Sequence, residues 1–486
     1  MSAAPRATHA NRVVSPAAFV PVAAPPRAPV PAGGPTPEWV STLADELRQA
    51  GAPLAERSAA EIAVSLGRVA ERLLDPADPL RAEALALIPP AAGISPEMAV
   101  AVLDGMAADW RADRLMRLMQ AELGGAAALD GFVAQHGRRA MAIGPALCVQ
   151  LVAGSVPGVG VSALVRSVLV KGPTLLKPGR GDAVLPVLFA RALREVDAAL
   201  ADAVAVVYWP GGSEALEDAA LAKADVVTAY GSDRTVRTLR ARAPVTARFV
   251  AYHHRVSVGV IGRDALTRPA VRVAASDVAR AVALFDQRGC VSPQIVYVER
   301  GGEVTAEGFA DALADALAEL EKRLPTGGLG VAEASSLQQA RGTAELMEST
   351  GSVRVRHGGS AAWTVVLGGE GAELTPAGRL VRLRSVADLS ELPELLEPLA
   401  SHLQTVGVAG LGDRVERLAG ALGKVGASRV APFAAIPFPP AWWHHDGRGP
   451  LLDLVRWVDV EPAQPGSATP APRAAIPPGP AAPPSR

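Results

Sequence analysis

Residues 147–158 read Leu-Cys-Val-Gln-Leu-Val-Ala-Gly-Ser-Val-Pro-Gly. The change from an apolar run to glycine, serine and proline inside this stretch decides the fold. The apolar run over 147–152 is typical of a buried strand, and the Gly-Ser-Val-Pro-Gly that follows predicts a turn. Apolar residues then recur through 164–169 at the spacing of a packed helix. A strand, a turn and a helix in this order form the repeating unit of a parallel α/β sheet.

The same unit recurs further along the chain. Short apolar runs that predict strands lie at 174–177, 204–209 and 225–230. Segments with helical spacing follow them at 184–196, at 214–223 and from residue 235 onward. Strands that alternate with helices predict a parallel sheet wound on both faces. Ligands of such sheets bind beyond the carboxyl ends of the strands, where the polar turns of this chain cluster.

Length and composition set the broad class. The 486 residues exceed a single hydrophobic core, and 49% of them are apolar, so two or three domains are expected. The net charge of −1 gives no electrostatic reason to expect nucleic acid or an anionic membrane as partner. Two cysteines argue against a disulfide framework and predict the reducing cytoplasm.

No membrane span and no metal site are predicted. The uncharged run over 143–165 is broken by proline and glycine, and the N-terminus lacks the pattern of a secretory signal. No Cys/His cluster has zinc-like spacing, and the pair His444-His445 beside Asp446 is only a weak metal candidate.

Six segments are expected along the chain. Both ends are rich in proline and alanine and are predicted to be disordered tails. Between the tails, a region of helical spacing precedes the alternating pattern. The expected ranges are 1–36 and 462–486 for the tails, 37–135 for the helical region, and 136–270, 271–405 and 406–461 for the remainder.

Segment 285–294, Phe-Asp-Gln-Arg-Gly-Cys-Val-Ser-Pro-Gln, places Cys290 between a predicted helix and a predicted strand over 294–298. A rigidly framed loop suits thiolate chemistry because the sulfur is accessible, backbone N–H groups are near, and Arg288 favours the anion. Position alone is equally consistent with a small buried hydrophobe. The buried role is the prediction for Cys148.

Two glycine-containing turns and one lysine are candidates for nucleotide binding, although no Gly-x-Gly-x-x-Gly motif is present. Gly211-Gly212 and Gly231-Ser232 each precede a predicted helix, whose N-terminus can bind phosphate. The alternative for both is a plain turn with a serine cap. Lys177 ends an apolar strand, where its cation would hydrogen-bond a ribose or simply reach solvent.

The cysteine segment closely resembles that of the LuxC-type long-chain fatty acyl-CoA reductases, a family of the aldehyde dehydrogenase superfamily. Further stretches agree in order and spacing, at 152–158, 207–212, 224–231, 443–448 and 454–459. The resemblance implies an α/β, aldehyde-dehydrogenase-like fold. Its parts would be a Rossmann-like nicotinamide-cofactor domain over 136–270, a catalytic domain over 271–405, and a return segment over 406–461 that completes the acyl channel and an oligomer contact.

The same resemblance implies a mechanism. The thiolate of Cys290 would attack an acyl thioester, and hydride from a nicotinamide would then reduce the acyl-cysteine to an aldehyde. The backbone N–H of Cys290 would hold the oxyanion. Relatives commonly carry asparagine as a second donor, and Ser155 takes that place here.

Two further departures from the superfamily pattern bear on the reaction. Hydrolytic members place a glutamate base in the segment that resembles 252–259, where this chain has no carboxylate and reduction is therefore favoured. His254, or its neighbour His253, would instead donate a proton, the alternative being a structural histidine. Arg180 stands where NAD-preferring members often have glutamate, so NADPH is expected, with NADH as the alternative.

The resemblance thus implies a cytoplasmic, homo-oligomeric reductase that converts an acyl-CoA or acyl-carrier-protein thioester to a fatty aldehyde, with an acyl-transferring enzyme as a further expected partner. Two alternatives remain open. One is a cysteine acyltransferase or thioesterase that transfers no hydride. The other is a non-catalytic subunit that binds acyl groups or a carrier protein.

Overall fold

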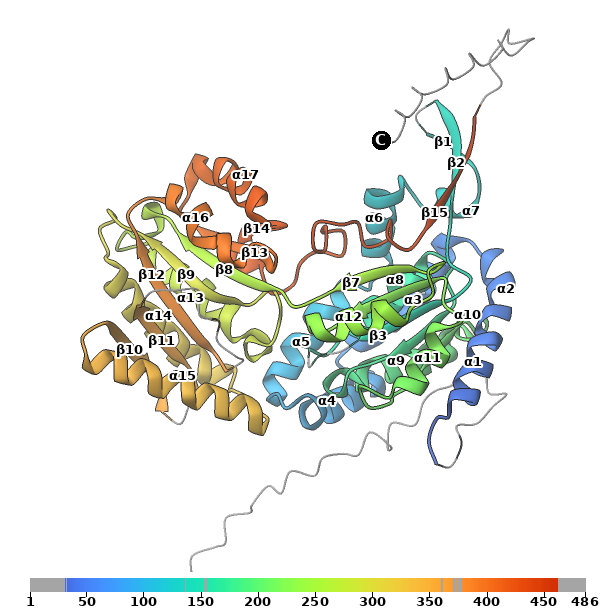
Figure 1. The fold of residues 1–486 in the computed structure, drawn as a ribbon, viewed down its shortest axis with the longest axis horizontal. Helices are drawn as coiled ribbons and strands as arrows, with labels where there is room; N and C mark the ends of the chain where they lie inside the picture. The colour runs from blue at the N-terminus through green and yellow to red at the C-terminus, as the bar shows by residue number, and fades with distance from the viewer. Residues whose placement is uncertain are drawn as a thin grey trace, which may run out of the picture.

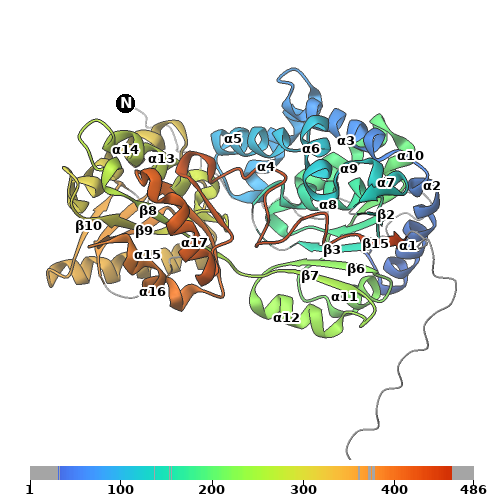
Figure 2. The same ribbon diagram turned by 90° about the horizontal axis from the view of Figure 1, so that it is seen from above.

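The computed structural model describes residues 31, 33–135, 137–152, 154, 156–359, 362–369, 374 and 378–461. Within these ranges two α/β bodies lie side by side (Figure 1). The chain passes from the first to the second between β7 and β8, and a C-terminal segment returns across the gap to the first (Figures 1 and 2). The predicted tails lie outside the described residues, except for residues 31 and 33–36, where the N–H of Gly34 donates to the carbonyl of Pro31.

The first body is built on a five-stranded parallel sheet with the order β5-β4-β3-β6-β7. Its strands are β3 (Cys148–Val152), β4 (Thr174–Lys177), β5 (Val204–Val206), β6 (Val226–Tyr230) and β7 (Arg248–Tyr252). Successive side chains of β3 point to opposite faces. Val149 and Leu151 pack in one apolar cluster, and Cys148 and Val152 pack in another.

Helices cover both faces of this sheet. The cluster that holds Val149 also holds apolar residues of α1 (Pro37–Gln49), α11 (Glu214–Leu221) and α12 (Asp233–Arg242). The cluster that holds Cys148 includes α8 (Val159–Leu169) and α9 (Val184–Val196), together with most of the N-terminal helices. The remaining helices of the first body are α2 (Gly51–Ala55), α3 (Ala59–Leu74), α4 (Pro79–Ala92), α5 (Pro96–Ala108), α6 (Ala112–Leu123), α7 (Ala127–Asp130) and the short α10 (Ala198–Ala201).

The second body is built on a seven-stranded sheet with the order β10-β11-β12-β9-β8-β13-β14, in which only the β10–β11 pair is antiparallel. Its strands are β8 (Val256–Ile261), β9 (Pro293–Glu299), β10 (Val353–His357), β11 (Thr364–Gly368), β12 (Leu380–Val386), β13 (Leu403–Ala409) and β14 (Arg429–Pro432). Its helices are α13 (Val271–Ala283), α14 (Ala306–Arg323), α15 (Val331–Ser349), α16 (Leu392–Leu396) and α17 (Val415–Val425).

A three-stranded antiparallel sheet joins the C-terminal segment to the first body. It consists of β1 (Val133–Gln135), β2 (Arg138–Ile143) and β15 (Arg456–Val460), in the order β1-β2-β15. Trp457 of β15 lies opposite Ala142 of β2, so the C-terminal segment is pinned to the first body after it leaves the second.

The strand and helix predictions agree with the structure at several places and differ at others. The strand over 174–177 and the helix over 184–196 have the predicted bounds. The strand expected over 204–209 ends at Val206, although the N–H of Val207 still donates to Leu176. The expected boundaries at 270 and 405 cut across sheet pairing, because β8 pairs with β9 and β13 runs through residue 405.

Among the described residues, no single helix is long and apolar enough to cross a membrane. Helices α4 and α5 together meet the length and composition, but they are bent by 115° at the break between them.

Candidate functional site

The loop that carries Cys290 begins in an unusual backbone conformation. Helix α13 ends at Ala283, so Phe285 already lies beyond the helix that precedes the cysteine. Phe285, Asp286 and Gln287 have φ angles of 60°, 49° and 63°, in the left-handed region. Residues other than glycine rarely adopt this region, because it costs about 1–3 kcal/mol for each residue. Contacts with the surrounding structure must therefore hold the segment in place.

A buried ion pair supplies the strongest of these contacts. The side chain of Asp286 is fully buried, and its Oδ1 accepts from Arg379 Nη2 at 2.7 Å and from Arg379 Nε at 3.0 Å. Arg379, itself 1% exposed, also donates to Glu321 at 2.6 Å. The other carboxylate oxygen of Asp286 accepts from the N–H of Gly327. The loop is therefore tied to α14 and to the start of β12 through charge-assisted hydrogen bonds.

Two more side chains fix the loop at its far end. Gln287 bridges the carbonyls of Pro293 and Leu380 through its Nε2 and accepts from the N–H of Leu380. Ser257 of β8 donates to the carbonyl of Cys290 at 2.6 Å. The nucleophile candidate is thus held on strands β8, β9 and β12 rather than on a free loop.

Arg288 does not favour the thiolate as the sequence suggested. Its Nε and Nη2 both donate to Glu333 at 3.0 Å, and its remaining donor groups reach the carbonyls of Gly93 and Gly328. All three nitrogens of the guanidinium donate to these partners, and its charge is paired with Glu333 rather than with the sulfur. Its role in the structure is to join the cysteine loop to α15 and to the α4–α5 connection.

The thiol of Cys290 is accessible but disfavours ionisation. Cys290 is exposed because it faces open cavity space. The surrounding protein nevertheless desolvates the sulfur and, with the nearby Asp446 carboxylate, raises the pKa of the thiol to about 11. The amide of Gln404 and the backbone N–H groups of Cys290 and Val291 oppose that increase by hydrogen bonding to the sulfur. Cys148, by contrast, is fully buried, and burial raises its pKa to about 12.

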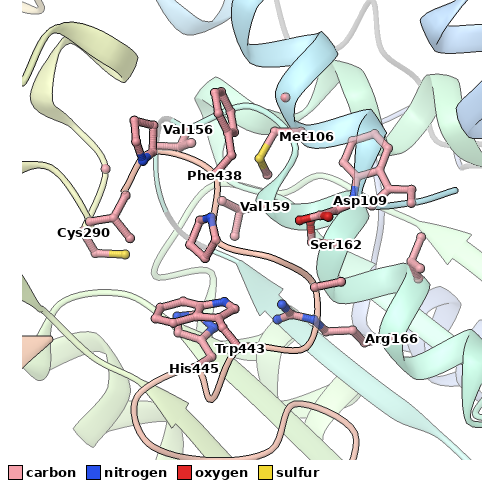
Figure 3. Close-up of a pocket in the computed structure, with 18 of the residues that line it drawn as sticks. Met106, Asp109, Val156, Val159, Ser162, Arg166, Cys290, Phe438, Trp443 and His445 are labelled. Carbon is pink, nitrogen blue, oxygen red and sulfur yellow. The ribbon is translucent and has the colours of Figure 1, made fainter. Parts of the chain in front are cut away.

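Two cavities meet at Cys290. The first encloses about 160 Å³ and is lined mostly by apolar side chains from α5, α6, α8 and residues 437–443 (Figure 3). The second encloses about 400 Å³ and is lined by the polar turns of the first body, including Gly154, Gly231 and Ser232. The residues common to both are Val156, Val159, Tyr230, Gly289, Cys290 and His445.

Three residues at this junction were not recognised from the sequence as site residues. His445 is stacked between Tyr252 and Trp443, with ring centroids 4.4 and 4.8 Å away. Burial lowers the pKa of His445 to about 3, so its ring is neutral. The other two residues, Gln404 and Asp446, are joined by a 2.6 Å hydrogen bond.

The Asp446 carboxylate also pairs with Arg255 at 3.1 Å. The only signal in the sequence was the His444-His445-Asp446 run, which we interpreted as a weak metal candidate. The three side chains do not converge, because His444 is exposed while the other two face the cavities. Within the described ranges, the one group of three with metal-like spacing is instead Asp233, His253 and His402.

The predicted partners of Cys290 are placed as follows. Ser155 lies outside the described residues. His254 lines the polar cavity together with Cys290, and burial, followed by repulsion from His402, lowers the pKa of its imidazole. Its neighbour His253 contacts Asp233, with 3.5 Å between Nδ1 and Oδ1.

The predicted cofactor residues lie at the carboxyl edge of the five-stranded sheet. Gly231 and Ser232 follow β6 and line the polar cavity, where Ser232 caps α12 by accepting from the N–H of Thr235. Lys177 ends β4, and burial lowers the pKa of its ammonium, which lies 5.9 Å from the ring centre of Tyr208. The remaining three lie nearby: Arg180 is exposed at the start of a 3₁₀ turn (Arg180–Asp182), and Gly211 and Gly212 form the turn after β5.

Comparison with known proteins defines the class. The structure is similar to an NAD-dependent aldehyde dehydrogenase from Sinorhizobium meliloti, with a TM-score of 0.68, 16% identity and coverage of 90% of this chain and 89% of that one. It is also similar to an NADP-dependent glyceraldehyde-3-phosphate dehydrogenase from Bacillus halodurans C-125 complexed with NADP, with a TM-score of 0.67, 14% identity and coverage of 88% and 92%. The fold is that of the aldehyde dehydrogenases.

The family follows from the sequence. The model of the acyl-CoA reductase (LuxC) family matches residues 54–457. A long-chain acyl-protein thioester reductase from Photobacterium phosphoreum is 24% identical over 381 residues, which cover 76% of this chain and 74% of that protein. Two further relatives with similar names are matched over 63% of their lengths. The chain belongs to the acyl-CoA reductase (LuxC) family and is an oxidoreductase.

The buried pair predicts a large loss of stability. We expect Asp286→Ala to lower the free energy of unfolding by about 3–5 kcal/mol, because it leaves Arg379 buried with one partner fewer. Urea unfolding followed by circular dichroism measures the difference. Glu319→Ala is the matched control, since it breaks an exposed pair with Lys322 and should change stability by less than about 1 kcal/mol. Equal effects in the two variants would contradict a stabilising role for the buried pair.

The electrostatics of the thiol predict its reactivity. Because the pKa is raised to about 11, the thiolate fraction and the rate of alkylation by iodoacetamide should rise about tenfold per pH unit between neutral pH and that value. Asp446→Asn removes the opposing charge and should speed alkylation of Cys290 about three- to tenfold at pH 8.

Site-resolved mass spectrometry measures that rate for Cys290 alone. Asp453→Asn is the control, since Asp453 pairs with Arg448 in the same segment and should leave the rate unchanged. A slower reaction in Asp446→Asn would show that Asp446 promotes ionisation of the thiol rather than opposing it.

Proposed function

We propose that this protein reduces an acyl thioester to an aldehyde through an acyl-cysteine formed on Cys290, with hydride from NADPH. The observation that carries the proposal is the position of Cys290 where an apolar cavity and a polar cavity meet. An acyl chain fits the first and a nicotinamide the second, and both would then approach the same sulfur. Family membership and the acyl-protein thioester reductases among the relatives support the same reaction.

In the acylation step, Cys290 sulfur forms a bond to the thioester carbonyl carbon, and the bond from that carbon to the carrier thiol breaks. The departing thiolate takes up the proton that the Cys290 thiol gives away. Asp446 lies beside the sulfur and would carry that proton, while the amide of Gln404 orients its carboxylate by a hydrogen bond. The backbone N–H of Cys290 would stabilise the oxyanion, with Ser155 as second donor.

In the reductive step, the polar cavity would hold a nicotinamide cofactor, which would supply the hydride that the acyl carbon needs. The acyl oxygen takes a proton, for which His254 is the donor we propose because it lines the same cavity. The thiohemiacetal on Cys290 then collapses, so the carbon–sulfur bond breaks, the hydroxyl proton returns to sulfur, and the aldehyde leaves. The sum is thioester, NADPH and a proton converted to aldehyde, free thiol and NADP⁺.

The residues of the polar cavity fit a nicotinamide cofactor. Gly154 faces this cavity at a φ of 129°, and a Cβ built on it would meet no atom within 4 Å, so the backbone leaves room for a ligand. Gly231 and Ser232 stand at the N-terminus of α12, where backbone N–H groups suit a phosphate. Outside this cavity, at or after the ends of neighbouring strands of the same sheet, Lys177 and Arg180 would hold the ribose and its 2′-phosphate, and the turn with Gly211 and Gly212 would bind the cofactor as well.

The absence of a carboxylate within residues 252–259 supports reduction over hydrolysis. Residues 252–259 would place a water-activating base near Cys290 in a hydrolytic enzyme, and here they supply tyrosine, two histidines and arginine. We further propose that the thioester is carried by CoA or a carrier protein, that an acyl-transferring enzyme is a partner, that the protein is a homo-oligomer, and that it works in the cytoplasm.

The decisive experiment follows NADPH oxidation and trapped aldehyde with a panel of acyl-CoA and acyl-carrier-protein thioesters. Wild-type protein should form aldehyde and NADP⁺ in equal amounts, and Cys290→Ala should lose at least about 10³-fold in rate because no acyl-enzyme can form. Cys148→Ala is the matched control and should retain activity. Thioester loss without NADPH or NADH consumption would favour a transferase or thioesterase, and thioester binding without turnover would favour a binding subunit.

The cofactor preference has its own test. We expect Arg180→Glu to lower the ratio of kcat/KM for NADPH to that for NADH by at least about tenfold, because a carboxylate repels the 2′-phosphate and binds the ribose hydroxyl. Steady-state kinetics with both cofactors measure the ratio. Arg417→Glu, on the exposed face of α17, is the control for charge reversal. An unchanged ratio in Arg180→Glu would remove Arg180 from the cofactor site.

A further inference from the structure

One charged side chain stands out in the wall of the apolar cavity. Helix α8 presents Val159, Ser162 and Arg166 to this space, three positions that share a helical face. Figure 3 shows Cys290 on one side of the cavity and the Ser162, Asp109 and Arg166 side chains on the other. The cavity is therefore apolar beside the sulfur and polar at its remote end.

The charge of Arg166 is not neutralised by an ion pair in the part of the chain that the structure describes. No ion pair within 4 Å joins a carboxylate there to its guanidinium, although its positive charge helps to lower the pKa values of the Asp109 and Glu122 carboxyls, against the larger effect of burial. The nearest acid of the cavity wall, Asp109, is already paired with Arg114 at 3.3 Å. An arginine stays charged at any working pH, so the cavity holds a cation with no direct ion-pair partner among the described residues.

A second donor stands beside this cation. Ser162 accepts a 3.0 Å hydrogen bond from Trp110 Nε1, and its own hydroxyl proton has no acceptor in the described residues. The indole thus orients the serine oxygen and leaves its proton for a ligand. Ser162 and Arg166 are one helical turn apart, so their donors can converge on a single group.

A plain alkyl chain would be a poor occupant of this end. It would strip water from the guanidinium and the serine hydroxyl and give no hydrogen bond in return, which is costly for a buried polar group. A carboxylate would accept from both Arg166 and Ser162 and would supply the missing negative charge. The apolar walls formed by Met106, Val159 and Phe438 suit the methylene groups between such a carboxylate and the thioester.

We propose that Arg166 and Ser162 form a subsite for a carboxylate at the far end of the acyl chain, so that the substrate class is the half-thioester of a dicarboxylic acid. The inference rests on the proposed function, since it assigns the acyl group of the same reaction. It also gives Arg166 a task that the reductase chemistry at Cys290 does not require.

The test uses ω-carboxyacyl-CoAs from succinyl to suberoyl, each beside the straight-chain acyl-CoA of equal length, with tetradecanoyl-CoA as the long-chain reference. Wild type should favour the ω-carboxyacyl member of the best pair by at least about tenfold in kcat/KM, as expected for charge-assisted hydrogen bonds. Arg166→Met should abolish that preference while retaining straight-chain activity. Arg166→Lys should keep part of it, and Arg417→Met, an exposed control on α17, should change nothing.

A second readout separates this inference from the proposed function. Acylation of Cys290 without nicotinamide, followed by mass spectrometry, scores the acyl preference before any hydride transfer. A carboxylate preference in acylation without aldehyde formation would overturn the reductase and leave the subsite standing. A wild-type preference for straight chains or tetradecanoyl-CoA, or an unchanged preference in Arg166→Met, would overturn the subsite alone. Neither acylation nor aldehyde with any thioester would overturn both.

Discussion

The ion pair between Asp286 and Arg379 is the constraint on which the geometry of the cysteine depends. It lies where water cannot reach it, so each charge depends on the other and on the hydrogen bonds from Gly327 and to Glu321. The free energy that this pair contributes offsets the strain of three consecutive residues in the left-handed region at the start of the loop. Because the loop is held on the sheet, the sulfur has a fixed direction relative to both cavities.

The surroundings of the sulfur work against its ionisation. Burial and Asp446 favour the neutral thiol, while Gln404 and two backbone N–H groups favour the anion less strongly. A resting thiol resists oxidation and stray electrophiles, because the thiolate is the reactive species. A substrate or cofactor that brings positive charge or hydrogen-bond donors into the junction would shift this balance toward the thiolate, so binding and activation are coupled through electrostatics.

The sequence sufficed for features that depend on neighbouring residues. Apolar spacing located β4 and α9 to the residue, and the turn residues around Cys290 indicated a framed loop. It failed where the partner is remote: Arg379 is 93 residues from Asp286, and Gln404 and Asp446 come from separate strands and loops. No local pattern shows that Arg288 turns toward Glu333, or that Arg166 faces a cavity. The roles of Ser155, His254 and the cofactor residues stay predictions.

The pairing of β15 with β2 means that part of the site is completed late in the synthesis of the chain. The segment that supplies Trp443, His445 and Asp446 is synthesised after every strand of both large sheets. Both bodies can therefore fold around their own cores during synthesis, before the side chains of Trp443, His445 and Asp446 are in place beside the thiol. The segment is then held by the pairing of Arg456–Val460 with β2 and by hydrogen bonds from Arg448 to the carbonyl of Ala251 and from the N–H of Leu451 to Glu122. A polypeptide that stops before residue 443 would therefore lack three of the side chains that line the cavities at the sulfur.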